Sequence, residues 1–325
     1  MQKPKVLRAF TSEELERAHH RLAQRVAFMM GRKFEEGDWS DVYCGAKAIP
    51  DSGWSNLHID IMYRGLGVEH KMLCYGSKPS ILEACGETLM HPAATRSIRV
   101  PDTDTDAKDA MVDVLTQYAE LIRGRAQKVQ EDAGGGSPDM RTGWLLWQAS
   151  LRGFLYFEEE MLAPEPDDYY AKWITRNGSG ARKGSTSLWI YERDTGQKRY
   201  SVTTSAGAKI QPYFDVPPPN HDYLYHFVVQ GEKLEDGLIR VWVTEETRRE
   251  LQRILGNTDT DALSADILET AERCDEHIDF EDQAARSAHP LLVQQKAYDA
   301  LRQIFPDSVN DAHLFQMFVE YRMNA

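Results

Sequence analysis

Residues 56–73 read NLHIDIMYRGLGVEHKML, and this stretch decides the fold that we expect for the chain. Two apolar runs lie on either side of a glycine-containing turn at residues 64–67, which is the pattern of a β-hairpin. Asp60 lies in the first run, whereas Glu69 and Lys71 lie two residues apart in the second. Pairing of the two runs would bring these three charges together within apolar β-structure.

The direction of the side chains sharpens this expectation. Because side chains alternate between the two faces of a strand, Glu69 and Lys71 share one face and His70 points to the other. Burying two carboxylates and an ammonium is costly unless they pair or hold a metal ion. The hairpin therefore predicts a functional site. The alternative is a structural ion pair between Asp60 and Lys71, with Glu69 exposed at a sheet edge.

The N-terminal half alternates between helical and strand patterns. The chain has 325 residues, of which 42% are hydrophobic and 27% charged, as in ordinary folded proteins. Apolar residues at helical spacing predict helices at 11–32 and after the acidic residues 102–106, and a short helix at 79–95. Residues 39–48 are expected to form a strand, and residues 143–162 a buried element that ends in one.

The C-terminal half changes in character after the Pro/Asp-rich residues 164–168. Four strand-like runs follow, SLWIYER, KRYSVTTSA, YLYHFVVQG and LIRVWVTE, with turns between them. From Glu245 onward the pattern is helical, with breaks at Gly256, Pro290 and Pro306. These changes predict three regions: a core at 1–165, a β-rich region at 166–244 and a helical region at 245–325.

An Asp in one strand followed, after eight intervening residues, by Glu-x-Lys in the next resembles the PD-(D/E)xK nuclease superfamily. The order of a leading helix, the hairpin, a second helix and a further strand is similar to that family's core over about residues 11–160. Ile59 stands where the motif has proline, and Asp51 is a rival for the first acid. The resemblance implies an α/β fold with a central mixed β-sheet flanked by helices, extended here by the β-rich insertion and the helical C-terminal part.

The resemblance also implies the roles of the hairpin residues. Asp60, Glu69 and Lys71 would be catalytic. Asp60, Glu69 and the backbone carbonyl of His70 would bind one or two Mg²⁺ ions, for which Mn²⁺ can substitute, and Lys71 would act on the attacking water. A carboxylate from Glu35 or Glu36 is a candidate for completing the site.

A basic segment lies within an otherwise acidic chain. The net charge is −13, which argues against general binding of nucleic acid, but residues 172–211 carry a local net charge of +6. Basic side chains that alternate with aromatic and hydroxyl residues are suited to DNA phosphates and base edges, and the alternative is a solvated, strand-rich surface. We expect target recognition from six residues of this segment: Arg182, Lys183, Arg193, Lys198, Arg199 and Lys209.

The sequence therefore predicts a Mg²⁺-dependent, sequence-specific endonuclease that cleaves double-stranded DNA, as type II restriction enzymes of bacterial restriction-modification systems do. Cleavage of both strands of a palindrome favours a homodimer. The alternatives are a non-catalytic protein that binds nucleic acid or a partner, and a repair or modification-dependent nuclease. No apolar run approaches the roughly 20 residues that cross a bilayer, and the N-terminus lacks the apolar core of a signal peptide, so we expect a cytoplasmic protein without membrane partners.

Overall fold

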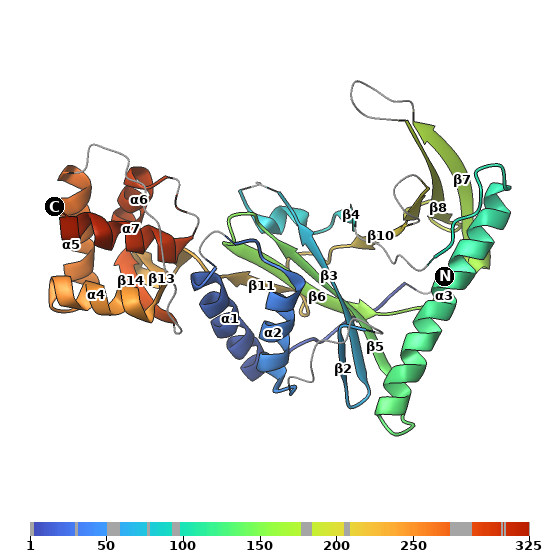
Figure 1. Ribbon diagram of the computed structural model, residues 1–325, viewed down its shortest axis with the longest axis horizontal. Coiled ribbons are helices and arrows are strands. Elements are labelled where there is room, and N and C mark those ends of the chain that lie inside the picture. Colours follow the sequence, from blue (N-terminus) through green and yellow to red (C-terminus); the bar gives the residue numbers. More distant parts are fainter. Residues whose placement is uncertain are drawn as a thin grey trace.

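Figure 1 shows the chain as a computed structural model. The structure describes residues 3–29, 32–50, 59–76, 79–92, 98–176, 184–204, 209–273, 288–306, 308 and 310–324. Within them it is an α/β protein with three β-sheets, of six, five and three strands, and seven α-helices. Among these helices none combines the length and the apolar character that a membrane span requires.

The largest sheet lies in the middle of the molecule and carries the hairpin (Figure 1). Its strands follow the order β1-β6-β5-β3-β2, and β11 also pairs with β6. Their bounds are β1 (Val6–Leu7), β2 (Ile61–Tyr63), β3 (Leu66–Cys74), β5 (Asp139–Trp147), β6 (Gly153–Glu160) and β11 (Tyr225–Val228). The β3–β5 pairing is parallel and the others are antiparallel, so the sheet is mixed. The connection that a parallel pair requires contains α3 (Ala107–Asp132).

One face of this sheet is covered by α1 (Ser12–Ala27) and α2 (Glu36–Lys47). Helix α1 begins where the sequence predicts. The hydroxyl of Thr11 accepts the N–H of Glu14 at 3.2 Å, and the Glu14 carboxylate accepts the N–H of Thr11 at 2.8 Å. This reciprocal cap satisfies two of the free N–H groups at the start of the helix.

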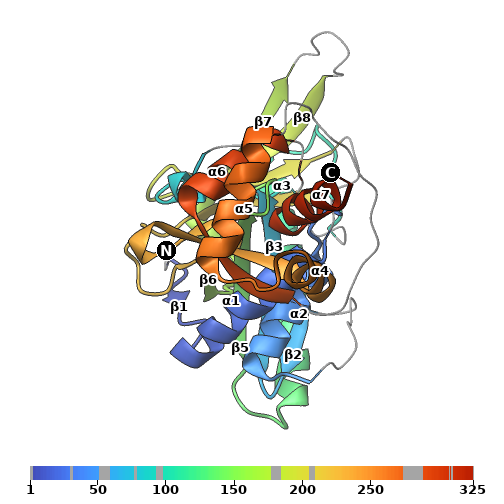
Figure 2. The ribbon, with the colours of Figure 1, turned by 90° about the vertical axis from the view of Figure 1, so that its left-hand side faces the viewer.

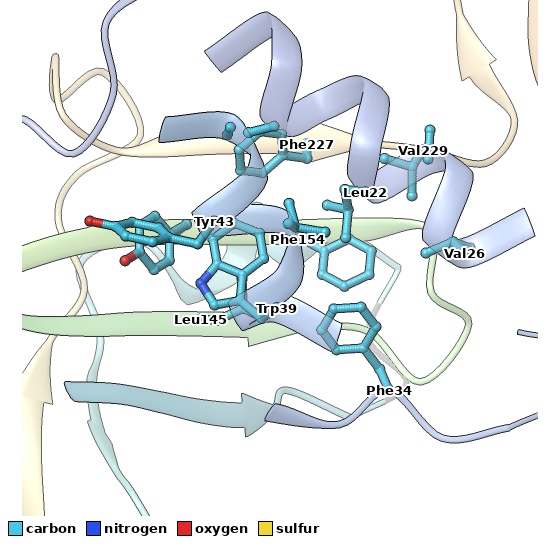
Figure 3. Close-up of a cluster of buried hydrophobic side chains, with 14 of the residues drawn as sticks. Leu22, Val26, Phe34, Trp39, Tyr43, Leu145, Phe154, Phe227 and Val229 are labelled. Carbon is cyan, nitrogen blue, oxygen red and sulfur yellow. The ribbon is translucent and has the colours of Figure 1, made fainter. Parts of the chain in front are cut away.

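Helix α2 corrects one prediction. The strand expected at residues 39–48 is wrong, because α2 extends through them to Lys47. Its buried residues Trp39, Tyr43 and Ala46 recur at intervals of three and four, which is the helical period and not the alternation of a strand. Figure 3 shows Trp39 and Tyr43 in the core, beside side chains of α1 and of the sheet.

The second sheet follows the order β4-β10-β9-β8-β7, and all its pairings are antiparallel. Its strands are β4 (Thr88–Met90), β7 (Tyr169–Arg176), β8 (Ser185–Glu192), β9 (Lys198–Thr203) and β10 (Lys209–Asp215). Strands β8 and β9 match two of the expected runs, whereas β7 and β10 were not expected. The helix expected at 79–95 is reduced to the 3₁₀ turn η1 (Ile81–Ala84), which β4 follows. A further 3₁₀ turn, η2 (Pro166–Asp168), precedes β7.

Helix α3 joins the two larger sheets. Its apolar side chains, including Met111 and Leu115, pack against Leu188, Ile190 and Val202 of the second sheet. Farther along, the same helix reaches the hairpin of the first sheet. The helix predicted after residues 102–106 is confirmed.

The C-terminal part forms a third unit at one end of the molecule, facing the viewer in Figure 2. Its elements are β12 (Glu232–Lys233), η3 (Glu235–Gly237), β13 (Leu238–Thr244), α4 (Glu245–Leu255), α5 (Thr260–Arg273), β14 (Ala288–Gln294), α6 (Gln295–Ile304) and α7 (Asp311–Asn324). The helical prediction is correct for α4 to α7 and wrong for β14. Pro290 lies in β14 instead of ending a helix, which is possible because β14 is an edge strand.

The strands also cross the expected regional boundaries. Strand β4, from the expected core, pairs with β10 in the second sheet, and β11, from the expected β-rich region, pairs with β6 in the first. The third unit includes β12 and β13 and so begins before Glu245. The cavity discussed below lies where the first two sheets meet.

Candidate active site

The predicted hairpin is present. Arg64 and Gly65 form a two-residue turn between β2 and β3, with φ angles of 49° and 85°. Positive φ at both positions suits the right-handed twist of the paired strands, and glycine adopts it without strain. Ile61 pairs with Val68, so Asp60, one residue before β2, lies opposite Glu69. The rival acid Asp51 and residues 56–58 lie outside the described residues.

Asp60 is held by the backbone of the neighbouring strand. Its Oδ2 accepts the N–H of His70 at 2.6 Å. Burial, together with the negative charges of Glu69 and Glu36, raises the pKa of Asp60 to about 7, although the Lys71 charge and the His70 hydrogen bond oppose the rise. A buried carboxylate with a raised pKa is stabilised when it binds a proton or a cation.

Glu69 is only 8% exposed and binds two cations. Lys71 Nζ lies 2.5 Å from its Oε1, and Nη2 of Arg125, from α3, lies 3.3 Å away. Burial opposes the charged form of Lys71, but the carboxylates of Glu69 and Asp60 outweigh it and raise the pKa of Lys71. The alternative with Glu69 exposed is therefore wrong, and the close ion pair within β3 joins Lys71 to Glu69 instead of Asp60.

His70 points to the opposite face, as the alternation predicts. Its ring is fully buried against Tyr43 of α2, and its Nε2 lies 3.2 Å from the hydroxyl of Tyr156. Burial lowers the pKa of His70 to about 3, so the ring is neutral. A Cβ on Gly143 would lie 2.5 Å from the Tyr156 hydroxyl and 2.7 Å from the His70 ring, so only glycine allows this contact.

The face that carries Glu69 and Lys71 opens into a cavity of about 560 Å³. In the register of the sheet, Glu69 pairs with Thr142 and Thr142 with Glu159, and all three line the cavity. Side chains of α3 and of the second sheet, among them Tyr118, Arg125, Arg199 and Tyr213, close the other sides. Glu69 and Glu159 therefore share a cavity with the cations Lys71, Arg125 and Arg199. Further acidic residues, among them Glu192 and Asp215, also line it.

Two cavity residues were missed at the level of sequence. Arg125 could have been noticed, because it falls at helical spacing among the apolar positions Tyr118, Ile122 and Val129 of α3. Glu159 gave no such signal, since it lies in a run of three glutamates. Its Oε1 accepts the indole N–H of Trp144 at 2.8 Å, and burial raises the pKa of Glu159 to about 7.

Of the two proposed additional acids, Glu36 is the one close to the hairpin. It lies in the first turn of α2, and its charge contributes to raising the pKa of Asp60. Burial raises the pKa of Glu36 itself, the Lys71 charge lowers it and the Glu69 charge raises it. Glu35 is exposed beside Arg32, at 3.8 Å.

The residues expected to contact DNA fall into three groups. Arg182 and Lys183 lie outside the described residues. Arg193 and Arg199 serve the fold: Arg193 donates to the carbonyls of Asp167 and Tyr169 at 3.1 and 2.6 Å, and Arg199 pairs with Glu192 and Asp215 at 2.6 and 2.9 Å. Lys198 and Lys209 lie on the second sheet without such a partner among the described residues.

The oxygen atoms near the hairpin suit a metal ion that prefers oxygen ligands and takes only a few of them from the protein. Within the described residues, no group of three or more His, Cys, Asp or Glu side chains is placed to hold a metal ion. Mg²⁺ differs from zinc or calcium in that it keeps several waters and binds through one or two carboxylates plus phosphate oxygens of the substrate. Asp60 and Glu69 fit that pattern.

Comparisons of the chain with protein-family models, with curated proteins and with solved structures give no match.

Proposed function

We propose that the protein is a Mg²⁺-dependent endonuclease that hydrolyses the phosphodiester bonds of double-stranded DNA, with a PD-(D/E)xK-type site. One observation carries the proposal. Two carboxylates, Asp60 and Glu69, lie opposite each other on neighbouring strands, with the Lys71 ammonium beside them on the face that borders the cavity. Structural ion pairs seldom include a carboxylate whose pKa is raised to about 7, as that of Asp60 is, because a matched cation would lower it.

Asp60 and Glu69 would hold the metal, with water and phosphate oxygens completing its coordination. When bound, Mg²⁺ supplies positive charge that activates a water and stabilises the attacking and leaving oxygens. The backbone N–H of His70 orients Asp60 and leaves its second oxygen available. The His70 carbonyl remains part of the proposed ligand set.

Lys71 and Arg125 would complement the phosphate. Both now pair with Glu69, at 2.5 and 3.3 Å. A cation on Glu69 would compete for these contacts and release the Lys71 ammonium toward the attacking water or a phosphate oxygen, where it stabilises negative charge. The partly buried position of Lys71 strengthens that interaction relative to water.

Incubation of a supercoiled plasmid with the purified protein and Mg²⁺ tests the proposal. The variants are Asp60→Asn, Glu69→Gln and Lys71→Ala, and the matched controls are Glu120→Gln and Lys108→Ala, both exposed on α3. We expect nicked and linear plasmid from the parent chain and the controls, and intact plasmid from the three variants. Cleavage that survives all three substitutions would assign the activity elsewhere.

The finer parts of the proposal are sequence specificity, resemblance to a type II restriction enzyme and action as a homodimer. Discrete fragments from a DNA of known sequence support a specific enzyme, whereas a smear indicates a general nuclease. Light scattering of the protein with and without a cleaved duplex measures the oligomeric state. If no DNA is cut under any condition, the ion pairs of Glu69 favour the alternative of a non-catalytic nucleic-acid-binding protein.

A further inference from the structure

The two faces of the second sheet differ in character. On the inner face, Leu188, Ile190 and Val202 pack against α3. The outer face carries the alternate residues of the same strands. Its aromatic members, none of them fully buried, are Tyr170 of β7, Trp189 and Tyr191 of β8, and Tyr213 of β10. Four aromatic side chains on a partly exposed sheet face are not needed for the core, which lies on the other side.

Four cations share this outer face with the rings: Lys172, Arg176, Lys198 and Lys209. Among the described residues, no carboxylate lies within ion-pair distance of any of them. By contrast, the inner side of the same sheet holds Arg199, which has two carboxylate partners, Glu192 and Asp215. The outer face is therefore positive and uncompensated within the described structure, in a chain whose net charge is −13.

The cations lie directly against the rings. Lys198 Nζ is 3.3 Å from the ring centroid of Trp189 and 4.9 Å from that of Tyr213, and the Arg176 guanidinium is 5.2 Å from the Trp189 ring. Tyr170 and Tyr191 stack with centroids 5.2 Å apart. Burial and the neighbouring Arg176 charge together lower the pKa of Lys198 to about 8, so an anion beside Lys198 would be stabilising.

We propose that this face, defined by Tyr170, Trp189, Tyr191, Tyr213 and the four cations, binds an unpaired strand of nucleic acid. The bases would stack on the rings and the phosphates would lie on the cations. Stacking is available to an unpaired strand because its base faces are free, whereas in a duplex they are covered by neighbouring base pairs. The face is formed by the four strands β7 to β10, and a four-stranded face with aromatic side chains has room to stack two or three bases.

The stacking face is next to the candidate active site. Tyr213 belongs to the face and also lines the cavity into which Glu69 and Lys71 open. The proposed binding face and the cavity therefore share one residue of β10. Binding itself does not depend on cleavage, so the inference stands or falls separately from the proposed nuclease.

Fluorescence anisotropy with a labelled oligothymidylate of about 12 nucleotides, in EDTA, measures binding. The parallel probes are the matching oligouridylate and a duplex of the same length. We expect the single strands to bind at least about tenfold more tightly than the duplex, because each stacked base contributes on the order of a tenfold effect or more. Binding of both the oligothymidylate and the oligouridylate would support stacking and phosphate contacts that DNA and RNA share. The ratio of the two dissociation constants would identify the preferred nucleic acid.

The variants separate stacking from charge. Trp189→Ala should weaken binding of the single strand about tenfold, and Trp189→Phe should weaken it much less. Lys198→Ala should weaken binding and, in addition, reduce the slope of log K against log salt concentration by about 1. Tyr223→Ala and Lys233→Ala, outside the face, are the matched controls, and circular dichroism checks the fold of each variant. Asp60→Asn should bind like the parent chain.

Two results would overturn the inference. One is duplex binding as tight as that of the single strand. The other is loss of binding in Lys198→Ala together with full binding in Trp189→Ala, which would indicate attraction by charge alone.

Discussion

The carboxylate of Asp60 accepts the backbone N–H of His70 at 2.6 Å, which ties the start of β2 to the middle of β3. The acid is thus oriented by the main chain of the strand that carries Glu69 and Lys71. Because the donor is the backbone N–H, the contact does not use the His70 side chain. His70 donates its backbone N–H toward Asp60, in the plane of the sheet, while its buried ring lies on the face opposite Glu69 and Lys71.

Asp60→Asn should abolish cleavage while keeping the fold. The amide oxygen can still accept from His70, whereas the charge needed to hold a metal is gone. We expect the rate in Mg²⁺ to fall by at least about a hundredfold, since even indirect disturbance of metal ligands commonly costs 10- to 100-fold. Plasmid cleavage measures the rate and urea unfolding the stability. An unchanged rate would exclude Asp60 as a ligand.

Arg125→Gln should change the dependence of cleavage on Mg²⁺. Arg125 pairs with Glu69 at 3.3 Å, so its removal makes Glu69 more available to a metal but withdraws a cation from the cavity. We expect half-maximal activity at a lower Mg²⁺ concentration, with a maximal rate reduced about 10-fold. Arg123→Gln, two residues away and paired with exposed Glu165, is the matched control. Identical Mg²⁺ titrations for both variants would contradict the assignment.

Glu159→Gln should stabilise the protein at alkaline but not at acidic pH. Burial raises the pKa of Glu159 from its ordinary 4.5 to about 7, against the Trp144 hydrogen bond and the Arg199 charge. Between these values the folded state binds more protons than the unfolded state, so its stability falls as the pH rises from about 4.5 to about 7.

The glutamine keeps an oxygen for Trp144 and has no charge, so this loss is absent from the variant. We expect the free energy of unfolding of the variant to exceed that of the parent chain by about 1–3 kcal/mol at about pH 8 and to equal it at about pH 4. Urea unfolding in EDTA at the two pH values gives the comparison. A difference between the two proteins that does not depend on pH would show that Glu159 titrates normally.

Gly143→Ala should destabilise the first sheet. The new Cβ would meet the Tyr156 hydroxyl at 2.5 Å and the His70 ring at 2.7 Å, neither of which is free to move in the packed core. We expect a loss of about 1–3 kcal/mol in the free energy of unfolding. Gly124→Ala is the control, because nothing lies within 4 Å of its Cβ on α3 and alanine favours a helix by about 0.5–1 kcal/mol. Equal stabilities of the two variants would contradict the close contact.

The local features of the hairpin could be predicted because they depend on near neighbours in the chain. The turn at Gly65 and the alternation of Glu69, His70 and Lys71 follow from backbone geometry alone. The sequence of α2 predicts a strand because a short apolar run fits both the helical and the strand period. Packing of Trp39 and Tyr43 against the sheet favours the helix.

The sequence by itself determined the α/β character, the hairpin and the pairing of Asp60 with Glu69, all of which rest on local periodicity and turn chemistry. Only the tertiary structure decided the partners of the charges. Arg125 contacts Glu69, which lies 56 residues away in the chain. Arg199 forms ion pairs with Glu192 and Asp215, whereas Lys198 forms no such pair among the described residues. These contacts depend on which sheet face packs against α3 and the cavity. Burial of a charged side chain on one face changes its free energy, and the local sequence pattern does not show which side chains are buried in this way.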